Sequence, residues 1–197
     1  MKKLALSLIA FVFIITGAKA QSGKGISLSV GPEFSIPFNT NSYYYGHVRD
    51  HYQDGIGGSA KIDIPLTSAL HLTGSAGFVD YPTNQHYLYL PLYLNINSAG
   101  PAAAVQPPPS KFVPLKAGLQ YYYSKYLYIS GEAGEAIKGN SSSLNSFIYS
   151  GGLGALIPFN AHNGLDIGAR YERGYKIYYY PSAMSQVSLR LAYQYKF

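Results

Sequence analysis

The residues whose types and spacing could bind a metal ion lie in the run HVRDHYQD, which contains His47, Asp50, His51 and Asp54. Imidazole nitrogens and carboxylate oxygens this close together are donors that divalent transition metals bind in proteins. The same residue types are ordinary in a solvated loop, and no second cluster of this kind completes a coordination shell. We therefore interpret the run as part of a contact surface, keep its four residues as the candidate metal ligands, and expect no cofactor.

Catalysis would need a nucleophile, a base and an orienting group, or a pair of acids at one site. The sequence contains no Gly-x-Ser-x-Gly elbow, no P-loop and no His-Glu-x-x-His motif. Its lack of cysteine also excludes thiol chemistry, thiolate-bound zinc and disulfides. We expect a protein that is not an enzyme.

A second group of ionisable residues falls in one alternating register with Gly, Ser and Thr. If these positions line a narrow β-barrel, acids and bases lie close together in a poorly hydrated interior, where unpaired charges are costly. Two interpretations are open: a structural salt-bridge plug, which the balance of acids and bases favours, and a gated path for ions or protons. The predicted lumen network consists of Glu33, Lys61, Asp63, His71, Lys116, Glu132, Asp166, Arg170, Glu172 and Arg190, and Lys196 shares the register.

The elements that must position these residues begin after a targeting segment. Lys2 and Lys3 precede an apolar run over residues 4–15 and then a small-residue pattern ending at Ala20. This arrangement is typical of a secretory signal peptide that is cleaved after export. We predict a signal peptide over residues 1–20 and one β-barrel domain over residues 21–197.

Composition favours a membrane barrel over a soluble domain. Cleavage after residue 20 lowers the formal net charge from +6 to +3, which is no signature of nucleic-acid binding. Charged residues make up 12% of the chain, against about 25% in soluble domains, while there are 21 Tyr and 21 Gly. An apolar exterior with tyrosines at both interfaces is what a lipid-facing barrel requires.

Period-two alternation sets the strands, in segments close to the roughly 9 to 11 residues of a tilted transmembrane strand. We predict a closed antiparallel transmembrane β-barrel, all-β, with eight strands over residues 25–37, 55–65, 69–80, 112–123, 126–136, 146–158, 164–173 and 186–197. The connections alternate strictly between short and long, as do the periplasmic turns and extracellular loops of outer-membrane barrels. Both chain ends are then periplasmic.

One further segment, HYLYLPLYLNIN over residues 86–97, alternates as well as the eight predicted strands. A ninth strand would put the C-terminus outside, so we place this segment in the second extracellular loop. A barrel of ten strands is the alternative if residues 175–180 also pair.

Tyrosines recur where the chain is predicted to cross a membrane interface, and they favour an aromatic girdle. The first set surrounds one short turn and comprises Tyr121, Tyr122, Tyr123, Tyr126 and Tyr128. The second is at the end of the chain and comprises Tyr193, Tyr195 and Phe197. A third set, placed in the last long loop, could pack there or bind a glycan or protein: Tyr175, Tyr178, Tyr179 and Tyr180.

These features together resemble the small outer-membrane β-barrel domains of Gram-negative bacteria, the OmpA-like, OmpX-like and PorT-like group. The resemblance is carried by the glycine-rich first strand, VPLKAGLQYY over residues 113–122, GEAG over residues 131–134, and the last strand ending at Phe197. It implies a location in the cell outer membrane, surrounded by lipid. It also implies that the barrel-assembly machinery reads the terminal aromatic strand, here Tyr193, Tyr195 and Phe197. Members share the barrel and differ in their loops.

Three functions remain open. The leading hypothesis is a non-enzymatic barrel with a structural or surface-interaction role, which contacts an extracellular protein or glycan through its loops. The second is a narrow pore for small solutes or ions. The third is a soluble, lipocalin-like ligand-binding barrel, which would need its apolar register inside and its charges outside.

Overall fold

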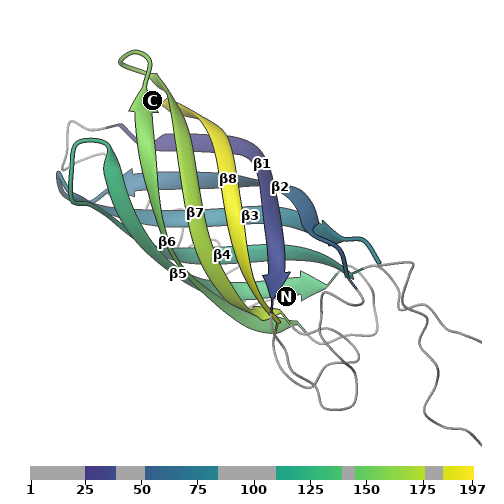
Figure 1. Cartoon of the computed structure of the whole chain (residues 1–197). Helices are drawn as coiled ribbons and strands as arrows, with labels where there is room; N and C mark the ends of the chain where they lie inside the picture. The colour runs from purple at the N-terminus through teal and green to yellow at the C-terminus, as the bar shows by residue number, and fades with distance from the viewer. Residues whose placement is uncertain (1–24, 39–51, 84–109, 139–144, 176–183) are drawn as a thin grey trace, which may run out of the picture.

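The computed structural model describes residues 25–38, 52–83, 110–138, 145–175 and 184–197, and these form one closed barrel (Figure 1). No helix within these ranges is long and apolar enough to cross a membrane. The predicted signal peptide over residues 1–20 lies outside them. The strands are β1 (Ser27–Phe38), β2 (Gly55–Pro65), β3 (Leu70–Tyr81), β4 (Ser110–Tyr122), β5 (Leu127–Lys138), β6 (Ser146–Pro158), β7 (Asn163–Tyr175) and β8 (Met184–Lys196).

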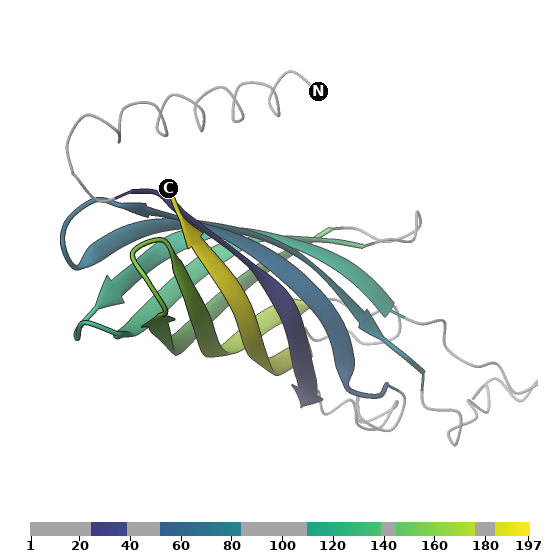
Figure 2. The same ribbon diagram turned by 90° about the horizontal axis from the view of Figure 1, so that it is seen from above.

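The predicted fold is confirmed: every strand pairs antiparallel with its sequence neighbours, and β1 pairs with β8 to close the barrel. Figure 2 shows the yellow β8 beside the purple β1 at this seam. No predicted strand boundary differs from the observed one by more than two residues. The ten-stranded alternative is wrong, because β3 pairs directly with β4 and β7 with β8, which leaves no place for an inserted strand. The segment 86–97 itself lies outside the described residues.

The three short turns lie at one end of the barrel together with the C-terminus (Figure 1), and we call this the turn end. Local side-chain bonds fix two of these turns. Thr67 Oγ1 accepts from the backbone N–H of Leu70 at 2.9 Å, and Asn160 Oδ1 accepts from that of Asn163 at 2.8 Å. Short polar side chains of this kind mimic backbone turns. The opposite end, from which the four long connections leave, is the loop end.

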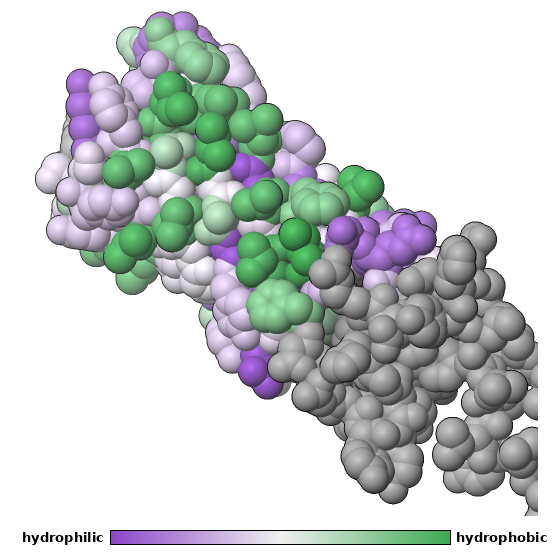
Figure 3. Space-filling view, in the orientation of Figure 1, coloured by the Kyte–Doolittle hydropathy of each residue, from purple (hydrophilic) through white to green (hydrophobic). Residues whose placement is uncertain are grey.

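Alternation along each strand separates an apolar exterior from a polar interior. In β8, for example, Leu189 and Leu191 are exposed while Ser188 and Arg190 are buried. Green apolar side chains accordingly gather along the barrel wall in Figure 3. A lipid-facing surface requires this distribution, whereas a soluble calyx requires the reverse. The lipocalin-like alternative is therefore wrong.

One bulge interrupts this alternation near the loop end of β7. Gly174 has φ = 128°, and the register with β8 shifts between Arg173 and Tyr175. A Cβ at Gly174 would lie 2.1 Å from the carbonyl oxygen of Phe147, so no larger residue fits there. The shift places the side chain of Tyr175, which is fully buried, inside the barrel.

Candidate functional site

The interior of the barrel holds two ionic clusters, and the first is centred on Asp166 of β7. Its Oδ2 lies 2.8 Å from Lys61 Nζ and accepts from Arg190 Nη1 at 2.8 Å. Its Oδ1 accepts from the hydroxyl of Tyr128 at 2.5 Å. One buried carboxylate therefore joins side chains from β2, β5 and β8, and we call this group with Asp63, His71 and Gln120 the turn-side cluster.

Arg190 extends the turn-side cluster across the seam of the barrel. Its Nε donates to Ser59 Oγ at 2.9 Å, and its Nη2 donates to Ser29 Oγ at 2.9 Å and to the Ser29 carbonyl at 3.1 Å. The guanidinium thus uses donors from all three of its nitrogens on groups of β1, β2 and β7. Such a fork of fixed donors suits a buried position where every N–H needs a partner.

Gln120 links the two carboxylates of the turn-side cluster. Its Oε1 accepts from Lys61 Nζ at 3.1 Å, and its Nε2 donates to Asp63 Oδ2 at 3.2 Å and to the Tyr122 hydroxyl oxygen at 2.8 Å. The other oxygen of Asp63 lies 2.5 Å from His71 Nδ1. This dyad is the part of the cluster nearest the turn end.

The second group, the loop-side cluster, is centred on Glu172 and contains three acids and two bases. Glu172 pairs with Lys116, and its Oε1 lies 2.6 Å from Arg170 Nε. Its Oε2 accepts from the Tyr175 hydroxyl at 2.8 Å and from Gln186 Nε2 at 2.6 Å. Arg170 also pairs with Glu33, and Lys116 lies 3.5 Å from Glu132.

All ten residues of the predicted lumen network lie on inward-facing positions, and each has at least one ion-pair partner. They fall into the two clusters, which face each other across a cavity of about 30 Å³. A cavity of that size holds no more than a few water molecules. Lys196, which shares the register, is exposed at the turn end.

Glycines make room for the aromatic ring that supports Asp166. The Tyr128 ring lies against Gly154 and Gly168, where added Cβ atoms would approach its hydroxyl group to 2.4 Å and 3.2 Å. Lys61 Nζ also lies 4.9 Å from the centre of this ring. Tyr128 is therefore held between Gly154 of β6, Gly168 of β7 and the Lys61 ammonium group, with its hydroxyl directed at Asp166.

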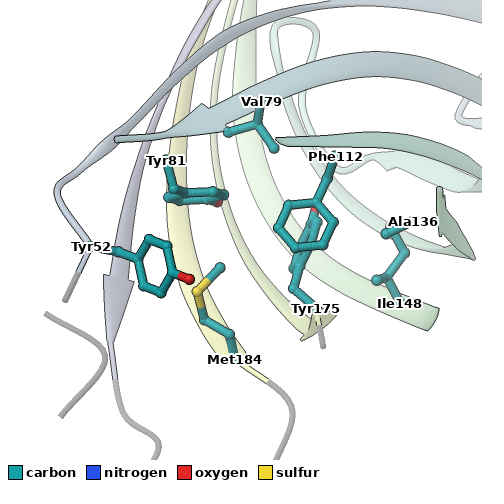
Figure 4. Packing of buried hydrophobic residues seen from close by; sticks show 8 residues of the cluster. All are labelled: Tyr52, Val79, Tyr81, Phe112, Ala136, Ile148, Tyr175 and Met184. Atoms are coloured by element: carbon teal, nitrogen blue, oxygen red, sulfur yellow. The ribbon is translucent and has the colours of Figure 1, made fainter. Parts of the chain in front are cut away.

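An apolar layer closes the interior above the loop-side cluster, and the sequence alone did not reveal it. We call it the aromatic plug, and Figure 4 shows its side chains converging from several strands. Phe112 packs edge-on against Tyr175 and Tyr81, with ring centroids 5.1 and 6.2 Å apart. The plug consists of Tyr52, Val79, Tyr81, Phe112, Ala136, Ile148, Tyr175 and Met184.

The structure corrects the predicted places of three tyrosines. Tyr122 and Tyr128 face the interior rather than the lipid interface. Each is next to an exposed residue of its own strand, Tyr121 and Ile129 respectively, and neighbouring residues of a strand point to opposite faces. Tyr175 ends β7 inside the plug rather than in a loop. Tyr121, Tyr123 and Tyr126 are exposed at the turn end, as are the predicted assembly-signal residues Tyr193, Tyr195 and Phe197. The remaining tyrosines of the last loop lie outside the described residues.

The candidate metal ligands are mostly beyond the described part of the chain. His47, Asp50 and His51 lie outside it, and Asp54 is half-buried just before β2 at the loop end. Within the described ranges, no group of three or more His, Asp or Glu side chains is arranged to hold a metal ion.

Comparison with known proteins identifies the fold. No family model and no curated protein matches the sequence. The attachment invasion locus protein Ail of Yersinia pestis matches with a TM-score of 0.54 and 17% identity, covering 88% of this chain and 99% of Ail. Ail in complex with the heparin analogue sucrose octasulfate matches with a TM-score of 0.52 and 16% identity, over 88% and 99% of the two chains. Neisserial surface protein A matches with a TM-score of 0.56 and 14% identity, over 88% and 97%. The chain thus has the fold of the small eight-stranded barrels of the bacterial outer membrane.

Proposed function

We propose that this outer-membrane β-barrel is a non-enzymatic protein that contacts a protein or glycan at the cell surface through the long connections at its loop end. The observation that carries the proposal is the filled interior. Two ionic clusters and the aromatic plug occupy successive levels of the barrel, from the turn end to the loop end. A barrel of eight strands is just wide enough for side chains to fill in this way.

The sequence of the long connections supports a partner that is recognised by aromatic contacts. Apart from Tyr52, which is buried in the aromatic plug, nine of the chain's 21 tyrosines lie in residues 39–51, 84–109 and 176–183. Arg49 and Lys176 are the only Lys or Arg residues in the sequence of the four long connections. Tyrosine side chains suit glycans and protein surfaces because each offers an apolar ring and a hydroxyl. The structure of Ail with a heparin analogue shows a polyanion on a barrel of this fold. With so few basic residues in its connections, we expect this chain to prefer a neutral glycan or a protein.

A binding experiment on loop variants tests the proposal. The intact protein in lipid nanodiscs is applied to arrays of neutral and sulfated glycans and to host or bacterial cell surfaces. Variants in which residues 40–50 or 85–108 are replaced by a short Gly-Ser turn should lose binding. A variant altered at Ala161, in the turn between β6 and β7 and outside the lining of the turn-end cavity, is the matched control and should bind normally. Heat-modifiable gel mobility establishes that each variant is folded.

Two results would contradict the proposal. If the intact protein binds no more than the two loop variants on every surface, the long connections have no contact role. If the protein in planar bilayers shows steady, large conductance, the narrow pore for small solutes or ions becomes the better description. We expect brief and rare conductance, because an ion would have to displace the buried ion pairs.

A further inference from the structure

A second cavity, of about 490 Å³, opens at the turn end of the barrel below the turn-side cluster. This volume lies within the range of small-molecule binding sites, roughly 300 to 1,000 Å³. Its inner wall contains Asp63, His71 and Tyr122, and its rim contains Lys125 and Lys196. Because short turns lie on the periplasmic side of outer-membrane barrels, this mouth faces the periplasm.

Nitrogen bases dominate the ionisable groups of this mouth. Asp63 is the only Asp or Glu among its lining residues, and both of its oxygens are already engaged, one by His71 and the other by Gln120. Lys125 and Lys196 are exposed, and neither has an acidic partner within 4.0 Å among the residues that the structure describes. Lys125 Nζ lies 5.1 Å from the centre of the Tyr126 ring, a contact that leaves its charge in place. Two ammonium groups without acidic partners create a positive potential at the entrance, which attracts anions.

Hydroxyl donors continue the polar surface inward from the two lysines. The Tyr122 oxygen accepts from Gln120 and the Ser27 Oγ accepts from Gln194 Nε2 at 2.8 Å. These two bonds use the oxygens as acceptors, so they do not engage the hydroxyl protons of Tyr122 and Ser27. An entering oxyanion would thus meet ammonium groups at the rim and O–H donors and an imidazole farther in.

The fixed side of the pocket is its inner wall. His71 is held by Asp63, and its ring lies against that of Tyr122 with 4.8 Å between centroids. Gln120 then ties both Asp63 and Tyr122 to the buried Lys61 and Asp166. A wall fixed by a buried network needs little reorganisation when a ligand binds, which favours affinity.

The geometry points to a periplasmic binding site for a small ligand that carries an oxyanion, which is a carboxylate or phosphate group. The groups that would contact the oxyanion are the ammonium groups of Lys125 and Lys196 at the rim and the His71 ring and Tyr122 hydroxyl on the inner wall, all of which line this cavity. The ligand stays on the periplasmic side, because the turn-side cluster fills the barrel beyond it. This site is separate from the surface contacts proposed for the loop end, and neither depends on the other.

Nuclear magnetic resonance of histidine side chains tests the site directly. The folded protein is placed in lipid nanodiscs, which leave both faces accessible, and its five histidines are labelled with nitrogen-15. A His71→Gln variant assigns the His71 signal. The probes are muramyl dipeptide for a carboxylate, glycerol phosphate for a phosphate, and N-acetylglucosamine as the neutral control. Concentrations extend to about 10 mM, which covers weak small-ligand binding.

We expect the His71 signal to shift in a saturable way with one or both anionic probes and to stay in place with the neutral sugar. Saturation by muramyl dipeptide alone would assign the site to carboxylate ligands, and saturation by glycerol phosphate alone to phosphate ligands. Lys125→Gln and Lys196→Gln should each weaken binding by about 2- to 5-fold, as for other exposed charges. Lys111→Gln is the matched control, because Lys111 is an exposed lysine at the loop end, and it should bind as the unmodified protein does.

The inference is overturned if neither anionic probe moves the His71 signal, or if the neutral sugar moves it equally. It is also overturned if the Lys125 and Lys196 variants bind like Lys111→Gln. Each variant is first checked for the heat-modifiable mobility of a closed barrel. Since the readout is a resonance inside the turn end, it responds to this site whatever the long connections bind.

Discussion

Replacing Lys116 with methionine is expected to lower the free energy of unfolding by about 3 to 5 kcal/mol, the usual effect of removing one partner from a buried ion pair. The Lys116 side chain is 2% exposed and pairs with both Glu172 and Glu132. The loop-side cluster already holds three acids and two bases, so its loss leaves three carboxylates with Arg170 alone. Methionine has nearly the same length as the lysine stem, so the packing is kept and the charge is what changes.

The measurement is urea unfolding of the protein folded in phospholipid vesicles, followed by tyrosine fluorescence, which no tryptophan obscures because the chain has none. Lys111→Met is the control. Lys111 is 55% exposed on its side chain and pairs with Asp80 at 3.2 Å, and exposed pairs of this kind contribute about 0.2 to 1 kcal/mol. Adding Glu132→Gln to Lys116→Met removes one unpaired carboxylate and should recover about 1 to 2 kcal/mol.

If Lys116→Met lowers the free energy of unfolding by less than about 1 kcal/mol, as the control does, the reasoning is refuted. The larger cost expected for a buried ion pair arises only where water is excluded from the remaining charge. It would mean that water reaches the loop-side cluster and screens its charges. Ion conduction through the barrel would then deserve the first test.

Two further variants probe other parts of the barrel. Gly154→Ala should destabilise it by about 1 to 3 kcal/mol in the same urea assay, because the new Cβ meets the Tyr128 ring that supports Asp166. Gly151→Ala, on the lipid-facing side with no atom within 4 Å of its Cβ, should be nearly neutral. Equal losses for both variants would mean that the space Gly154 leaves for the Tyr128 ring is not needed for stability. Phe197→Gly should reduce the amount of folded protein in the outer membrane of cells while refolding in vesicles proceeds normally. Phe147→Gly, which also removes an exposed phenylalanine, is its control, and equal yields in cells would remove Phe197 from the assembly signal.

The strands were predictable because period-two alternation is strong when one face contacts lipid and the other a polar interior. The same alternation was sufficient to place Tyr128, which shares its register with the buried Glu132. The girdle prediction grouped tyrosines by their closeness in sequence and ignored this register, so it put Tyr122 and Tyr128 on the wrong face. Register therefore has to be applied to aromatic residues as strictly as to charged ones.

The aromatic plug was harder to predict, because its members interrupt the polar register one or two to a strand. Val79, Phe112 and Ile148 each look like isolated exceptions in sequence, and only the pairing of neighbouring strands brings them to one level. Tyr175 enters the plug through the bulge at Gly174, which shifts the side chain to the other face. The ion-pair partners could not be predicted for the same reason, because only the closed barrel brings them together. Glu33 and Arg170, for example, are 137 residues apart in sequence and meet across the interior.

The contacts of Arg190 have a bearing on how the barrel is completed. Its partners are Ser29 on β1, Ser59 on β2 and Asp166 on β7, so the guanidinium is satisfied only after the first and last strands have met. In an open sheet within lipid, Arg190 would lie on the free edge strand, and some of its N–H groups would have no hydrogen-bond acceptor. Zipping the two edges together supplies hydrogen bonds along both backbones and shelters the arginine in the same event. We expect partly closed forms of the barrel to be sparsely populated, so that the β1–β8 seam closes in one cooperative step.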